Sequence, residues 1–299
     1  MRVVITGGTG FIGSILTEKL KKKGHEVIIF TRKPSSHHNG VQYVQWLTDH
    51  ASPENEAGHV DAFINLAGVS IDDGRWTEER KKQIRDSRMT ATQEVLRIMR
   101  VLPAKPEVLV NASAIGIYPP SLTAQYTEDS TAVGDDFLAK TVYDWEGLAR
   151  QAAELGVRTV CTRFGIVLGK DGGALPLIKL PYQLFAGGKI GSGNQWFSWV
   201  HVEDVANAII FSLENKAVEG PVNVVAPSPM HMNAFGKTIG KVLHRPHWFP
   251  VPSFAMKAAL GEKSIVVLQG QHVLPQKLLA NGFTFDYPSL RPALENLLK

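Results

Sequence analysis

Three glycines near the start of the chain have the spacing of a loop that holds phosphates. They belong to the run Gly7–Gly13, which directly follows the β-branched run Arg2–Thr6 and precedes a helical pattern. In such a loop Gly7 permits a tight turn, Gly10 lets the backbone approach a pyrophosphate, and Gly13 lets helix and strand pack closely. The helix N-terminus then offers free N–H groups and the positive end of its dipole. We predict a dinucleotide site rather than a purely structural turn, with contacts from Gly7, Thr9, Gly10, Phe11, Ile12 and Gly13.

The end of the next strand predicts which dinucleotide binds. An NAD site generally has Asp or Glu there, to hold the ribose 2′-hydroxyl. This chain has Thr31 at that position, followed by Arg32 and Lys33. A carboxylate would repel a 2′-phosphate, whereas Arg32 can form a forked pair with the phosphate and stack on adenine. The sequence therefore predicts NADP(H) as the cofactor, held by Arg32 and Lys33; two solvated loop cations are the alternative.

Three further strand ends are candidates for the same crevice, because ligands bind at the carboxyl edge of a parallel sheet. Leu66, Ala67 and Gly68 are expected to border the adenosine side of the cofactor. Ser113 is expected either to contact the cofactor and a substrate oxygen or to be a plain turn hydroxyl. Arg163 is predicted to bind a phosphate or to pair with an acidic residue.

The elements that must position these residues alternate between β-branched runs and helical patterns. Such alternation predicts an α/β fold with a doubly wound parallel sheet of Rossmann type. Residues 1–165, with part of 200–230, are expected to form the NADP-binding domain, and 166–299 mostly a smaller C-terminal substrate lobe. The expected strands are Arg2–Thr6, Val27–Phe30, Val41–Val44, Ala62–Leu66, Val108–Asn111, Arg158–Phe164 and Val222–Val225. The expected helices are one after Gly13, then Thr77–Met99, Asp136–Leu155, Phe235–Leu243 and Leu290–Leu298.

Composition limits the classes of function. No stretch of the 299 residues approaches the roughly 18 apolar residues of a membrane helix, and no signal peptide precedes the glycine loop. The single Cys161 excludes an internal disulfide and fits a reducing compartment, so we expect a cytoplasmic protein. The formal charge of +4 is spread over 32 basic and 28 acidic residues. We therefore expect a small-molecule ligand, no nucleic-acid or membrane partner, no metal, and a monomer or homodimer.

Several motifs together resemble a known superfamily over the whole chain. Thr6–Gly13, Asn65–Gly68, Ser113–Tyr118 and His201–Asp204 follow the order found in extended short-chain dehydrogenases/reductases. The chain is more closely similar to the atypical "epimerase family" branch of NAD-dependent epimerase/dehydratase-like proteins, which includes the bacterial YfcH-like proteins. From about His247 it resembles a domain of unknown function associated with that branch. The closer resemblance is carried by Arg75–Arg80, Arg85–Arg88, Gly191–Trp199 and Gly270–Pro275.

The resemblance implies a catalytic Tyr with a Lys four residues later on one helix, and this pair is missing. Aligned on Trp145 and Glu146, the two positions are Leu138 and Val142, which transfer no proton. Tyr143 cannot substitute, since five helical steps from Leu138 rotate it by about 140° from that face. Lys140 is rotated by about 200°.

The resemblance also implies an Arg before the His201 motif to hold a substrate diphosphate, and Phe197 stands there instead. A nucleotide-sugar substrate is therefore not expected. The aromatic residues here favour either an apolar or ring-shaped ligand or packing in a core. The predicted substrate-binding residues are Gln195, Trp196, Ser198 and Trp199.

Without the Tyr–Lys pair, Ser113 and Tyr118 are the candidate catalytic residues, with Asp135 and Asp136 as weaker ones. Tyr118 without a neighbouring cation would titrate near its ordinary value of about 10 and could act as an acid in carbonyl reduction; the alternative is a wall residue. Two functions remain open: an NADP(H)-dependent oxidoreductase or epimerase with an altered proton relay, and a non-catalytic NADP(H)-binding sensor or interaction protein.

Overall fold

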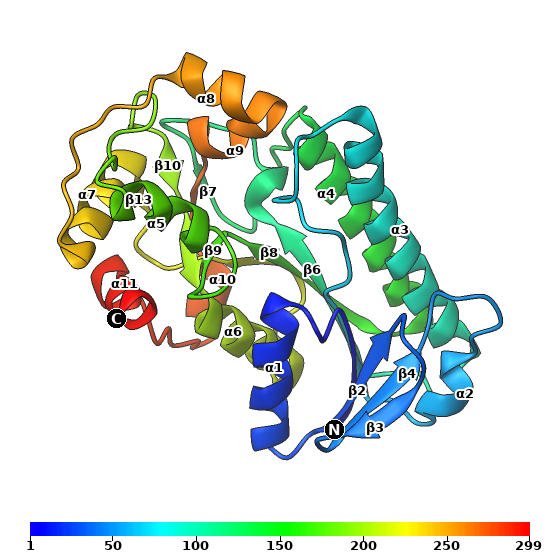
Figure 1. Cartoon of the computed structure of the whole chain (residues 1–299). Helices are drawn as coiled ribbons and strands as arrows, with labels where there is room; N and C mark the ends of the chain where they lie inside the picture. The colour runs from blue at the N-terminus through cyan, green and yellow to red at the C-terminus, as the bar shows by residue number, and fades with distance from the viewer.

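An eight-stranded sheet runs through the middle of the computed structural model, which describes residues 1–299 (Figure 1). Across the sheet the order is β12-β8-β6-β5-β1-β2-β4-β3, with parallel pairing except between β3 and β4. The direction of winding reverses between β1 and β5, the switch point at which doubly wound sheets bind ligands. The predicted α/β Rossmann-type fold is confirmed. Its strands are β1 (Arg2–Thr6), β2 (Glu26–Thr31), β3 (Ser36–His38), β4 (Val41–Gln45), β5 (Ala62–Asn65), β6 (Val108–Ala114), β8 (Arg158–Phe164) and β12 (Gly220–Val224).

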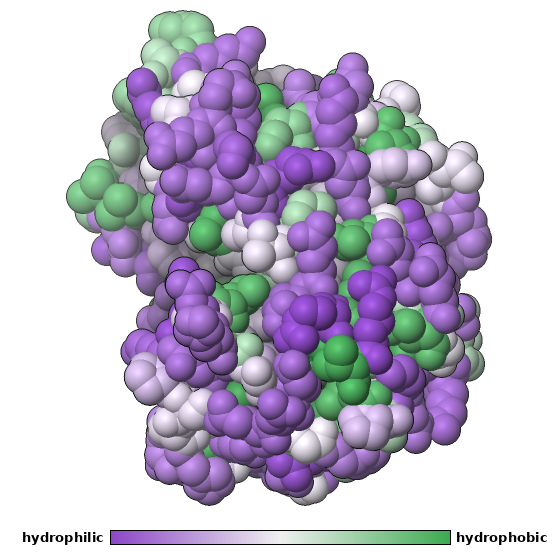
Figure 2. Space-filling view, turned by 90° about the vertical axis from the view of Figure 1, so that its right-hand side faces the viewer, coloured by the Kyte–Doolittle hydropathy of each residue, from purple (hydrophilic) through white to green (hydrophobic).

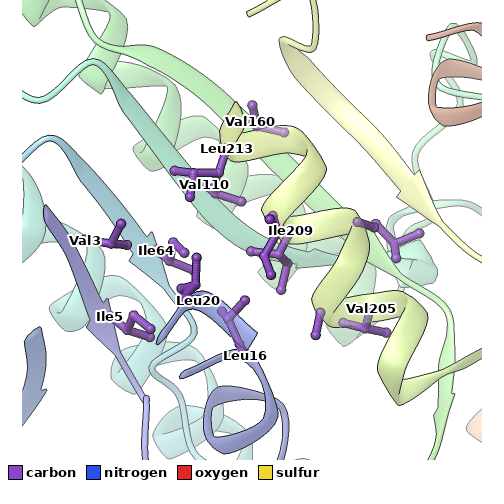
Figure 3. Close-up of a cluster of buried hydrophobic side chains, with 14 of the residues drawn as sticks. Val3, Ile5, Leu16, Leu20, Ile64, Val110, Val160, Val205, Ile209 and Leu213 are labelled. Atoms are coloured by element: carbon purple, nitrogen blue, oxygen red, sulfur yellow. The ribbon is translucent and has the colours of Figure 1, made fainter. Parts of the chain in front are cut away.

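Helices cover both faces of this sheet because its strands are apolar on both sides. On β1, Val3 and Ile5 belong to one core and Val4 to the other. The first core contains side chains from α1 (Phe11–Lys22) and α6 (Val202–Glu214), which Figure 3 shows meeting the sheet. The second contains side chains from α3 (Glu78–Val101), and α4 (Phe137–Ala149) packs beside α3. The two layers of helices hold the carboxyl ends of β1, β5 and β6 at one edge.

The rest of the chain forms a lobe beyond that edge and then returns to the sheet. The lobe has its own core around Trp199, Phe235 and Leu294. Leu278 and Phe283, by contrast, pack into the first core of the sheet. The remaining elements are α2 (Pro53–Ala57), η1 (Ile115–Ile117), β7 (Gln125–Tyr126), η2 (Arg150–Leu155), β9 (Ile166–Leu168), α5 (Leu175–Gln183), β10 (Trp196–Phe197), β11 (Trp199–His201), β13 (Met230–His231), α7 (Met232–Leu243), α8 (Ser253–Leu260), η3 (Gly261–Ser264), α9 (Ile265–Leu268), β14 (His272–Val273), α10 (Gln276–Ala280) and α11 (Leu290–Leu298). No helix is both long and apolar enough to span a bilayer.

Each predicted strand and helix is present, with ends that differ by up to three residues, whereas several elements of the lobe, among them α5, α8 and α10, were not predicted. The expected helix Asp136–Leu155 starts after Asp136, whose carboxylate caps it by accepting from the Ala139 N–H, and its last turn is the 3-10 helix η2. Helix α6 was not predicted. Nine of its 13 residues are buried, so it lacks the polar face by which a surface helix is recognised.

Candidate functional site

The glycine loop packs tightly against the protein on one side and has free space on its solvent side. Gly7 has φ +71°, and a Cβ there would lie 2.8 Å from the Leu66 carbonyl oxygen. A Cβ on Gly13 would lie 2.3 Å from the Gly7 carbonyl oxygen, so the start of α1 needs a glycine there to pack against the loop. Gly10 is exposed, and a Cβ on it would meet one protein atom, the Gly7 oxygen, at 3.2 Å. The space above Gly10 is the space that a pyrophosphate needs.

The first turn of α1 points unpaired N–H groups at this space. The N–H groups of Phe11, Ile12 and Gly13 have no backbone acceptor, and no side chain caps the helix. The first turn also has no acidic residue, so nothing neutralises the positive end of the dipole. The Phe11 ring packs on the glycines of the run Gly169–Gly173, where added Cβ atoms at Gly169 and Gly172 would lie 2.3 and 2.4 Å from it. Phe11 can therefore serve a cofactor through its N–H group.

The two cations expected to select the cofactor are free. Arg32 and Lys33 follow β2 directly, at the same sheet edge as the glycine loop. Both are exposed, and neither side chain has an acidic partner. The Thr31 hydroxyl, which replaces the acid of NAD sites, accepts from the Lys33 N–H at 3.2 Å.

The turn after β5 is held from both sides. The Thr6 hydroxyl accepts from the Ala67 N–H at 3.3 Å, and the Ser87 hydroxyl accepts from the Val69 N–H at 3.1 Å. The Arg88 guanidinium donates to the Val69 carbonyl at 3.1 Å and lies 5.2 Å above the Trp145 ring. Burial lowers the pKa of Arg88 to about 10. Sequence reasoning missed this positioning role, although Arg88 ends one of the segments that carried the family resemblance.

Ser113, Glu146 and Arg163 form a buried cluster behind the sheet edge. The Ser113 hydroxyl donates to Glu146 at 2.5 Å, and the Arg163 guanidinium donates to both Glu146 oxygens at 2.7 and 2.8 Å. All three are buried, and Glu146 is 1% exposed. Burial opposes the charge of Arg163, but the Glu146 carboxylate outweighs it and raises the pKa of Arg163. Of the two roles predicted for Arg163, the geometry favours pairing with an acid, and Ser113 faces Glu146 rather than open space.

Tyr118 belongs to the same cluster. Its hydroxyl lies 2.9 Å from the Thr127 carbonyl and the Asn223 Oδ1, and it accepts from Arg163 at 2.7 Å. The side chain is 1% exposed, and burial raises its pKa against the opposing effect of Arg163. The expectation that no cation neighbours Tyr118 is wrong, because Arg163 comes from a strand 45 residues further along the chain. The placement favours the alternative of a wall residue.

The helix face that should carry the Tyr–Lys pair is apolar, as expected. Val142 packs in a small core with Ile115 and Tyr118, and Leu138 approaches Gly116. Tyr143 is 54% exposed on the opposite side of α4, and Lys140 is exposed as well. Asp136 serves as the helix cap and Asp135 is exposed, so neither lies in a buried catalytic setting.

Three of the four predicted substrate residues are buried. The Gln195 amide donates to the Ile190 and Val267 carbonyls. The Ser198 hydroxyl donates to the Gln271 carbonyl at 2.7 Å, and Trp199 is fully buried in the core of the lobe. The placement of Trp199 favours the packing alternative, and the polar groups of Gln195 and Ser198 are bound to backbone carbonyls. Trp196 remains half-buried, between the rings of His231 and His272.

The C-terminal lobe contacts the segment between β5 and α3, and the first turn of α3, through three cationic side chains. Arg75 donates to the Ala258 carbonyl of α8 at 2.8 Å, and Lys81 pairs with Glu262 at 2.9 Å. In the opposite direction, Lys263 donates to the Asp72 carbonyl. The stretch from α8 to η3 is therefore joined to the Rossmann domain beside the turn after β5.

Residues 3–226 match the NAD-dependent epimerase/dehydratase family. The chain belongs to this family. Residues 251–297 match a domain of unknown function, DUF1731, which agrees with the resemblance seen from about His247. The matched residues include the glycine loop, and also Leu138 and Val142, where the resemblance implied the Tyr–Lys pair.

Relatives within the family are similar over the whole chain. The Bacillus subtilis epimerase family protein YfhF is 48% identical over 299 residues, covering 100% of this chain and 98% of that protein. The human epimerase family protein SDR39U1 (isoform 2), solved with NADPH, has a TM-score of 0.90 and 39% identity, with 99% of each chain covered. A Corynebacterium glutamicum nucleoside-diphosphate sugar epimerase has a TM-score of 0.78 and 29% identity, covering 99% of this chain and 58% of that one.

Proposed function

We propose that this protein binds NADP(H) across the glycine loop, with Arg32 and Lys33 selecting the form that carries the 2′-phosphate. The observation that carries the proposal is the pairing of an uncapped helix start with two free cations and no acid after β2. The diphosphate would be held by the N–H groups of Phe11, Ile12 and Gly13. The human relative solved with NADPH supports the choice of coenzyme.

Titration calorimetry tests this proposal with NADPH and NADH on the native chain and on Arg32→Glu. We expect the native chain to prefer NADPH, and Arg32→Glu to weaken NADPH by about tenfold or more, since a charge-assisted hydrogen bond contributes about 1.5–3 kcal/mol. NADH affinity should change far less. Arg291→Glu, on an exposed position of α11, is the matched control. Equal losses for both coenzymes, or no heat with either, would overturn the proposal.

Of the two functions that the sequence left open, we propose the non-catalytic one: the bound coenzyme acts as a signal rather than as a reagent. Ser113 and Tyr118, the hydroxyls expected to handle protons, are buried and bound to Glu146, Asn223 and Arg163. A proton donor must reach the substrate oxygen within hydrogen-bond distance. The Ser113 and Tyr118 hydroxyls are buried and already hydrogen-bonded within the protein, so they do not meet that requirement.

Hydride transfer to a small carbonyl compound is the second candidate. It is favoured by the segment from α8 to η3, which reaches the Rossmann domain through Arg75, Lys81 and Lys263 beside the proposed coenzyme site. A protein that merely displays its coenzyme needs no such covering segment. Incubation with NADPH and a panel of aldehydes and ketones, followed by the absorbance of reduced nicotinamide, separates the two. Turnover above the rate without protein would overturn the non-catalytic proposal while leaving the coenzyme proposal intact.

A further inference from the structure

The positive charge of the chain is concentrated in the C-terminal lobe. Residues 172–202 and 220–261 contain no Asp or Glu. Without the cations of these two stretches, the formal charge of +4 would become −2. The six cations are Lys179, Lys189, Lys237, Lys241, Arg245 and Lys257.

Three of these cations line a surface hollow of 470 Å³ at the end of α7. Its other lining residues are His244, His247 and Gly240, and no carboxylate borders it. Lys237 and Lys241 lie one helical turn apart and repel each other, an arrangement that destabilises a helix unless an anion is bound. The helix dipole favours Lys241 in the last turn, but its effect does not reach Lys237. The hollow therefore has the charge and the space for phosphate groups.

Exposed apolar side chains border this hollow. The Arg245 guanidinium, which lines the hollow, lies 4.5 Å from the Phe185 ring, and Trp248 donates its indole N–H to the Phe185 carbonyl. Phe185, Trp248 and Phe249 are each more than half exposed. Exposed apolar groups gathered beside polar ones mark interaction sites. Figure 2 shows the side of the molecule away from α7, and the surface there is largely hydrophilic.

We propose that this basic-aromatic face, formed by the hollow and by Phe185, Trp248 and Phe249, docks on a bilayer of anionic phospholipids. Lipid phosphates would enter the hollow, and the aromatic rings would lie at the boundary between headgroups and acyl chains. Such docking requires no spanning helix. The sequence led us to expect no membrane partner, because charge was judged over the whole chain and spanning segments were sought. The cations of α7 and of the turn after it instead form a local basic surface beside exposed aromatic rings.

Two other occupants fit the face less well. A second copy joined by a two-fold axis would place the basic hollow against an equally basic surface, which repels. A nucleic acid would satisfy the cations, and the exposed rings of the face could stack on its bases. Leu177, Leu180 and Leu184 on and beside α5 are also more than half exposed, however, and would gain nothing from it. Aliphatic side chains do not stack on bases as aromatic ones do. They do enter the apolar region of a bilayer.

Vesicle co-sedimentation of the full chain tests the proposal. We expect binding to vesicles of equal parts phosphatidylglycerol and phosphatidylcholine at low salt, and little binding to phosphatidylcholine alone. The double variant Lys237→Glu/Lys241→Glu should weaken vesicle binding by at least about tenfold, given the contribution of each cation near an anionic surface. The control, Lys82→Glu/Lys216→Glu, reverses two exposed lysines outside the lobe and should bind normally. Trp248→Ser/Phe249→Ser should also weaken binding, which charge alone would not explain.

Several results would overturn the docking proposal. These are no binding to the anionic vesicles, equal losses in the control variant, and a preference for an oligonucleotide over vesicles. Calorimetric binding of inorganic phosphate without vesicle binding would indicate a small phosphate ligand instead. A dimer in light scattering that Trp248→Ser abolishes would assign the face to a second copy. NADPH binding should be unchanged in all these variants, so the outcome is independent of the proposed coenzyme function.

Discussion

Replacing Glu146 with glutamine tests whether the cluster behind the sheet edge is structural. The Glu146 carboxylate accepts three hydrogen bonds of 2.5–2.8 Å, one from Ser113 and two from Arg163. Arg163 is 6% exposed and has no other carboxylate partner. Without the carboxylate, the guanidinium would stay buried with its charge uncompensated.

The expected cost follows from that burial. Removing one partner of a buried ion pair costs about 3–5 kcal/mol, mostly because the remaining charge is left unpaired. The amide oxygen of Gln can still accept one hydrogen bond, so we expect a value near 3 kcal/mol. The contact between Arg150 and Glu146 at 3.4 Å adds little, because Arg150 is half exposed. Since proteins are stable by about 5–15 kcal/mol, such a loss is easily measured.

Urea unfolding followed by tryptophan fluorescence and circular dichroism measures the loss. Glu154→Gln, at an exposed position of η2, should leave the unfolding free energy unchanged. The double variant Glu146→Leu/Arg163→Met should recover much of the stability, because it removes both charges. A loss below about 1 kcal/mol for Glu146→Gln would refute this reasoning. If that variant instead abolished a turnover found with NADPH while keeping its stability, the cluster would be part of a reaction site.

Four further single-residue variants test the loop, the cluster and a buried carboxylate. Gly10→Val should abolish NADPH binding in calorimetry yet leave the folded circular dichroism spectrum, whereas Gly13→Ala should unfold the chain, because its Cβ would lie 2.3 Å from the Gly7 oxygen. Tyr118→Phe should lower the unfolding free energy by about 1–3 kcal/mol, since Arg163 loses an acceptor, and keep NADPH affinity; a large loss of affinity would count against a wall role. Burial raises the pKa of Asp204 from 3.8 to about 6, so the native state binds its proton more tightly than the unfolded chain. The unfolding free energy of the native chain, compared with that of Asp204→Asn, should therefore fall as pH rises from about 4 to about 6 and stay constant above pH 6. Urea unfolding at several pH values measures this comparison. A free-energy difference between the two proteins that does not change with pH would contradict the raised pKa of Asp204.

The sequence by itself determined the parts of the site that depend on neighbouring residues. The strand, glycine loop and helix at the N-terminus follow one another within 22 residues. Their spacing in the sequence is therefore enough to predict how they are arranged. The absence of an acid before Arg32 and the apolar residues at Leu138 and Val142 are likewise visible in the sequence. Helical periodicity was enough to place Tyr143 and Lys140 away from the expected face.

Only the tertiary structure decided which polar side chains are open to a ligand and which are hydrogen-bonded to other residues of the protein. Ser113, Tyr118 and Arg163 each lie at or just after a strand end, where a ligand contact was a reasonable prediction. Their partners come from positions far along the chain; Glu146 is 33 residues from Ser113, and Asn223 is 105 residues from Tyr118. Strand alternation predicts the face on which a side chain lies, but not the helix residue that meets it there. Pairing across the fold therefore follows from how the layers pack.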